Sequence, residues 1–161
     1  MPRIYLETLI SAPAELCFDL SRDVDVHMAS TGVTGERAVA GVKSGMMELG
    51  DTVTWEARHF GVRQRLTSRI TAFERPRMFV DEMQRGAFNR WRHTHLFTPK
   101  QNSTLMIDDV DFASPFGWLG RVVDALALKD YMARLLTERN SHIKHVAESP
   151  DRILSHQSLP H

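Results

Sequence analysis

The residues best suited to chemistry are His93 and His95, which lie two positions apart, and Asp108, which follows in the next apolar stretch. An imidazole beside a carboxylate can act as a general base, shuttle a proton or hydrogen-bond the polar end of a ligand. Each of these roles requires that the chain bring the three side chains to one buried face. The elements that position them therefore decide which chemistry is open.

The segment 89–112 reads as a β-hairpin around a turn at residues 99–102. With a four-residue loop there, the expected pairs on the apolar face are Trp91–Val110, His93–Asp108, His95–Met106 and Phe97–Thr104, with Asn89 opposite Phe112. The other face then sets Arg92 against Asp109 and Arg90 against Asp111, and opposite charges on a solvated face favour this register. It predicts His93 and Asp108 as cross-strand neighbours, with His95 beside them.

A second hairpin is predicted around a two-residue loop at Phe60 and Gly61. It sets Arg65 opposite Glu56 on the outer face. The more apolar face is expected to point inward and carries Trp55, Ala57, His59, Val62, Leu66 and Ile70.

A metal site is a further use of the two histidines, because His93-x-His95 places both imidazoles on one strand face. A third ligand with a defined place is missing, and His59 or Asp108 could supply it only if the strands bring them close. His142 and His145 favour the surface of a helix end, where imidazoles meet the negative dipole. We therefore expect no metal and no cofactor.

Composition predicts one domain and excludes a disordered chain: 161 residues carry 20 Lys+Arg, 20 Asp+Glu and 42% apolar residues. The segment from Arg58 to Arg92 contains nine arginines and only three acidic residues. This is typical of a solvated sheet surface, with an anionic or phosphate-bearing partner as the alternative; without a nucleic-acid motif, no nucleic-acid partner is expected.

Cys17 is the only cysteine and no apolar run of membrane-spanning length occurs, which predicts a soluble, cytoplasmic monomer or weak homodimer without stable membrane insertion.

The order of elements is a first strand, one or two short helices starting after Pro13, about six strands to Ala113, and one long helix after Pro115. The domain is expected to span residues 1–148, followed by a mobile tail over 149–161. A curved antiparallel sheet covered by a single long helix leaves a space between the two, where small ligands bind.

The runs at residues 50–61, 79–83, 91–97 and 114–117, read together over residues 3–147, resemble bacterial members of the START-related superfamily (SRPBCC), which includes the polyketide cyclases. The resemblance implies an α+β helix-grip fold, in which a seven-stranded curved antiparallel sheet surrounds a long C-terminal helix and two short helices follow the first strand. It also implies a cavity for lipids, polyketides or other apolar molecules.

Three functions are consistent with this reading. The first is binding, transport or sensing of a small apolar or amphipathic ligand, with a cavity lined by Trp55, His59, Trp91, His95, Phe97, Met106, Phe112 and Leu126. The second is a cyclase, dehydratase or hydrolase with His93 and Asp108 as general base. It is disfavoured because no catalytic set of the cyclases carries over to this sequence residue by residue, and because the scaffold hosts carriers as well as enzymes. The third is a protein-interaction module that uses the exposed arginines.

Overall fold

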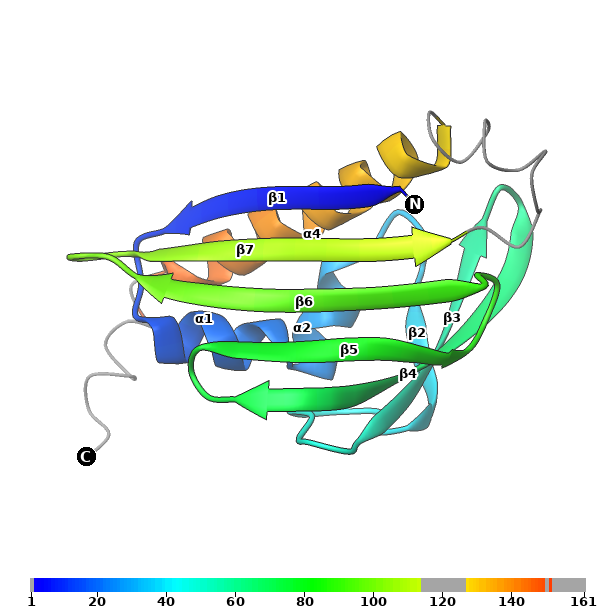
Figure 1. The fold of residues 1–161 in the computed structure, drawn as a ribbon, viewed down its shortest axis with the longest axis horizontal. Helices are drawn as coiled ribbons and strands as arrows, with labels where there is room; N and C mark the ends of the chain where they lie inside the picture. The colour runs from blue at the N-terminus through cyan, green and yellow to red at the C-terminus, as the bar shows by residue number, and fades with distance from the viewer. Residues whose placement is uncertain (1, 114–126, 150, 152–161) are drawn as a thin grey trace.

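The computed structural model describes residues 2–113, 127–149 and 151. They form an α+β helix-grip fold, as expected (Figure 1). In chain order the elements are β1 (Arg3–Ile10), α1 (Ala14–Ser21), α2 (Val24–Ser30), β2 (Arg37–Gly41), β3 (Thr52–His59), β4 (Val62–Glu74), β5 (Met78–Arg85), β6 (Arg90–Pro99), β7 (Thr104–Ala113) and α4 (Lys129–Ala147). Leu126, and residues 150 and 152–161 of the predicted tail, lie outside the described residues.

One antiparallel sheet contains all seven strands in the order β1-β7-β6-β5-β4-β3-β2. The three helices of the described residues, α1, α2 and α4, lie on a single face of it, with α4 running behind β1 and β7 (Figure 1). One side of the sheet is covered, and this is clearest in β6 and β7, where buried residues alternate with less buried ones. None of the described helices is long and apolar enough to cross a membrane.

The β3–β4 hairpin has the predicted register, with Trp55 opposite Leu66 and Glu56 opposite Arg65. Its two-residue turn is possible because Phe60 and Gly61 both adopt positive φ angles, of 51° and 75°. The two short helices also begin as local chemistry dictates. Pro13 stands directly before α1, and the carboxylate of Asp23 accepts hydrogen bonds from the first backbone amides of α2.

The predicted β6–β7 register is wrong by two residues. The loop spans residues 100–103, closed by a hydrogen bond from the Lys100 amide to the Ser103 carbonyl. Pro99 ends strand β6 instead of starting the turn, a place where its missing amide proton costs little. The observed pairs are therefore His95–Asp108, His93–Val110, Phe97–Met106 and Trp91–Phe112. Because side chains alternate with a period of two, this error leaves every residue on its predicted face.

Because the β6–β7 register differs from the predicted one, charged residues on the outer face also have different partners. Arg92 pairs with Glu82 of β5 at 3.1 Å, and Asp109 binds Arg3 of β1 at 2.6 Å, so the predicted Arg92–Asp109 pair does not form. The predicted Arg65–Glu56 pair is present at 2.8 Å, and Arg37 adds a second bond to the same carboxylate at 2.7 Å.

Glu56 gives a prediction on the pH dependence of stability. Its side chain is only 5% exposed, and hydrogen bonds from Arg37 and Arg65 lower its pKa from 4.5 to about 2. A depressed pKa stabilises the fold above the ordinary pKa, and this stabilisation is lost as the pH falls from about 4.5 towards 2. We expect Glu56→Gln to be less stable than wild type at pH 7 and the gap in unfolding free energy to shrink between about pH 5 and pH 3 in urea titrations.

The matched control is Glu138→Gln, which removes a carboxylate from an exposed position on α4. It should change stability little at either pH. If the difference in unfolding free energy between Glu56→Gln and wild type stays constant across this pH range, the lowered pKa of Glu56 is contradicted.

Candidate functional site

A cavity of about 370 Å³ lies among the described residues between the sheet and α4. This size is within the range of small-molecule sites. Its wall is largely apolar and includes Val53, Trp55, Leu66, Phe79, Trp91 and Leu136. Phe60 in the β3–β4 turn also lines it and is 73% exposed, so the cavity reaches the surface beside this turn.

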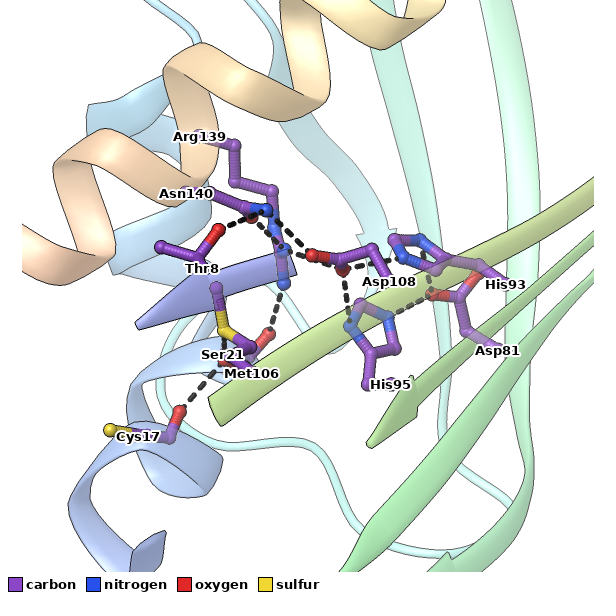
Figure 2. A network of polar contacts seen from close by, with 10 residues as sticks. All are labelled: Thr8, Cys17, Ser21, Asp81, His93, His95, Met106, Asp108, Arg139 and Asn140. Atoms are coloured by element: carbon purple, nitrogen blue, oxygen red, sulfur yellow. Dashed lines mark hydrogen bonds and ion pairs between the residues drawn. The ribbon is translucent and has the colours of Figure 1, made fainter. Parts of the chain in front are cut away.

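A cluster of polar side chains closes one side of the cavity, and we call it the polar floor (Figure 2). Strands β5, β6 and β7 and helix α4 each contribute to it, and its members are Asp81, His93, His95, Asp108, Arg139 and Asn140.

Asp108 is the centre of the polar floor and has no exposed surface. One carboxylate oxygen, Oδ1, accepts from His93 Nε2 at 2.7 Å and lies 3.4 Å from Arg139 Nη1. The other, Oδ2, accepts from Asn140 Nδ2 at 2.6 Å. Burial alone raises the pKa of this carboxyl group, but the hydrogen bond from His93 and the charge of Arg139 hold it well below its usual value. Asp108 is thus a buried carboxylate that protein donors stabilise.

Arg139 is held in turn from two further sides. Its Nη1 donates to the Asn140 side-chain oxygen at 3.1 Å, and its Nη2 donates to the Ser21 carbonyl of α1 at 3.1 Å. The network therefore ties α4 both to the sheet and to α1.

The two imidazoles of the polar floor pack against each other, with ring centroids 3.7 Å apart. Burial and the neighbouring His95 lower the pKa of His93 to about 4, in spite of its bond to Asp108. His93 is therefore neutral at pH 7 and donates its Nε2 proton to Asp108. Its other nitrogen, Nδ1, is unprotonated and lies 3.8 Å from Asp81 Oδ2.

His95 is stacked on Phe79 and bonds Asp81 through Nε2 at 3.2 Å. Although burial raises the pKa of Asp81, the bond from His95 lowers it below its ordinary value. The Nδ1 atom of His95 is 3.2 Å from Asp108 Oδ1 but is badly aligned, and it has no hydrogen-bond partner among the described residues.

The structure brings some of the predicted site residues together and separates others. The cavity wall includes Trp55, His59, Trp91, His93 and His95, with Asp108 directly behind the two imidazoles of the polar floor. His59 bonds the Tyr131 hydroxyl of α4 at 2.9 Å.

Three residues that were predicted to line the cavity are buried and do not line it in the described part of the chain: Phe97, Met106 and Phe112. They point to the predicted face, but helices and neighbouring aromatic rings cover them: Phe97 packs on Phe18 of α1, and Met106 lies against Ser21. Phe112 packs on Trp91.

Sequence reasoning missed Asp81, Arg139 and Asn140. A signal for Asp81 exists, since alternation along β5 places it on the same face as Phe79. Arg139 and Asn140 fall between Leu136 and Ile143 on the buried stripe of α4, and polar residues in such a stripe need a buried partner.

Because Arg139 is buried and compensates Asp108, its loss should be costly. We expect Arg139→Met to lower the unfolding free energy by about 3–5 kcal/mol, the usual cost of leaving a buried charge without its partner. The control is Arg134→Met, an exposed position on the same helix, which should change it by less than about 0.5 kcal/mol. Urea unfolding measures both, and equal losses would refute the role of Arg139.

No known family model matches the sequence, and no curated protein matches it. Solved structures do match. A protein from Thermus thermophilus shares 18% identity, with a TM-score of 0.71 over 92% of this chain and 100% of that one. A START superfamily protein from Mycobacterium smegmatis gives 15% identity and 0.68 over 91% and 97%, and ginseng (Panax ginseng) major latex-like protein 151 gives 13% and 0.68 over 92% and 98%. The chain therefore has the START-related fold.

Proposed function

We propose that this chain binds one small apolar or amphipathic molecule in the cavity between the sheet and α4. The observation that carries the proposal is an apolar cavity of about 370 Å³ with a preformed polar floor on one side. The START-related fold supports it, because the START superfamily protein and the major latex-like protein share this arrangement of sheet and helix.

The chemistry of the polar floor limits which polar group the ligand carries. Towards the cavity it offers His93 Nδ1, an acceptor, and the Asp81 carboxylate, also an acceptor. A hydroxyl or amine of the ligand can donate to these atoms. A free carboxylate would meet the like charge of Asp81, and the Arg139 guanidinium, which also lines the cavity, already donates to Asp108, Asn140 and Ser21. We therefore expect an apolar body with at least one donor group.

Catalysis is the second candidate, and the 2.7 Å bond between His93 Nε2 and Asp108 favours it. A carboxylate that orients a histidine, whose other nitrogen faces a cavity, is the arrangement of a general base. The same geometry also holds a histidine in place as a simple hydrogen-bond acceptor, so binding is the more economical proposal. Unchanged turnover of an identified substrate by His93→Ala would exclude catalysis through this pair.

Cavity filling tests the binding proposal. Ala57 lines the cavity and is 6% exposed, so Ala57→Phe projects a ring into it. We expect this variant to bind N-phenyl-1-naphthylamine, an apolar fluorescent amine, at least about tenfold more weakly than wild type, a loss of about 1.4 kcal/mol. Fluorescence titration gives the dissociation constants.

Ala40→Phe is the control, because it adds the same ring at an exposed position on β2. It should bind the dye like wild type, and circular dichroism should show both variants folded. Equal affinity in the two variants, or no dye binding by wild type, would count against a ligand in this cavity.

A further inference from the structure

We infer that Asp81, His93 and His95 form a mononuclear site for a divalent transition-metal ion on the polar floor. The inference goes beyond ligand binding and does not depend on it, since the site is built from two neighbouring strands. Asp81 of β5 stands opposite His93 of β6, and His95 follows on the same face. It also revises the expectation from sequence, which lacked a third ligand with a defined place.

The donor atoms already converge. One ligand atom from each of the three residues lies within 4.8 Å of the other two. Asp81 Oδ2 lies 3.8 Å from His93 Nδ1 and 3.2 Å from His95 Nε2. Two ligands at about 2.0–2.2 Å from one ion stand about 2.8–3.1 Å apart at a right angle and about 3.3–3.6 Å apart at the tetrahedral angle. The 3.2 Å distance falls between these ranges, and side-chain rotation has to shorten the 3.8 Å distance.

A second observation, independent of the ligand atoms, supports the site. Metal-bound histidines almost always donate their other ring N–H to a carboxylate, a backbone carbonyl or water, which fixes ring orientation and tautomer. Here the ring nitrogens that point away from Asp81, His93 Nε2 and His95 Nδ1, face the same Asp108 oxygen at 2.7 Å and 3.2 Å (Figure 2). Arg139 and Asn140 hold that carboxylate from the other side.

Metal binding also gives a partner to the buried His95 Nδ1, which has none among the described residues. In the metal-free protein His95 donates its Nε2 proton to Asp81. When Nε2 binds an ion, a neutral ring carries its proton on Nδ1, which lies 3.2 Å from Asp108 Oδ1. The ring rotation that brings Nε2 to the ion also has to align this N–H group with the carboxylate.

Charge favours a cation at this position. Asp81 and Asp108 bring two negative charges to the polar floor, and Arg139 brings one positive charge. With both imidazoles neutral, as metal ligands must be, the group carries one excess negative charge. A divalent ion offsets it and leaves a net positive charge, which a bound water or a ligand oxygen can face.

The donor set identifies the class of ion. Two imidazole nitrogens and one carboxylate suit zinc, iron(II) or cobalt(II), whereas magnesium and calcium prefer sites made of oxygen alone. All three residues line the cavity, so the remaining coordination positions point into it. A ligand held in the cavity would thus meet the ion directly.

The test is metal titration of the full chain after EDTA treatment and dialysis. We expect one equivalent of Zn²⁺ by calorimetry, and visible absorption bands of tetrahedral or five-coordinate Co²⁺ on titration with cobalt. Asp81→Asn keeps the size of the side chain and should weaken Zn²⁺ binding by at least about 100-fold, and Asp108→Asn by about 10–100-fold, the usual effect of removing an outer partner.

The control is the double variant His142→Gln/His145→Gln, which removes the other histidine pair, on α4. It should bind Zn²⁺ and Co²⁺ like wild type. Circular dichroism and a cooperative thermal transition show whether each variant is folded, and if Asp81→Asn is unfolded, His95→Gln carries the same expectation. The proposal is overturned if wild type binds no single equivalent of Zn²⁺. It is also overturned if Zn²⁺ binding survives both Asp81→Asn and His95→Gln but is lost in His142→Gln/His145→Gln.

Discussion

The buried charge of Asp108 is the constraint on which the rest of the structure depends. A carboxylate with no exposed surface is tolerated only when protein groups replace water, and each bond it accepts fixes the position of another element. His93 sets β6 against β7, while Arg139 and Asn140 set the rotation of α4 over the sheet. The Arg139 bond to the Ser21 carbonyl extends the constraint to α1. Helix α4 cannot slide or turn without leaving this charge unpaired.

Aromatic packing then divides the space between sheet and helices into core and cavity. The rings of Phe73, Phe79 and Phe97 each contact the Phe18 ring of α1 edge to face, with centroid distances of 5.2–5.3 Å, and form the core at that end. Beside the polar floor the space stays open, with Trp55 and Trp91 in its wall. The polar floor lies between these two regions: the His95 ring stacks on Phe79, and both imidazoles line the cavity.

Sequence alone predicts the fold and the inward faces of the strands, because alternation and turn chemistry are local. Even the two-residue error in the β6–β7 register leaves His93, His95 and Asp108 on the correct face. The contact of Asp81 with the histidines is not predictable in this way. Asp81 meets the histidines through the β5–β6 pairing, and the connection over residues 86–89 is a run of bends without the tight-turn residues that fix a register from sequence. The contribution of Arg139 depends on how a distant helix is rotated over the sheet, which no local pattern specifies.

Asp108 fixes the tautomer of His93, so that this ring presents an unprotonated Nδ1 beside Asp81. Long-range ¹H–¹⁵N correlation spectra of the ¹⁵N-histidine-labelled, metal-free protein at pH 7 report this directly, since protonated and unprotonated ring nitrogens have well-separated shifts. Asp108→Asn identifies the His93 signals. We expect a neutral His93 ring with its proton on Nε2. A His93 imidazolium, or a ring protonated on Nδ1, would contradict it.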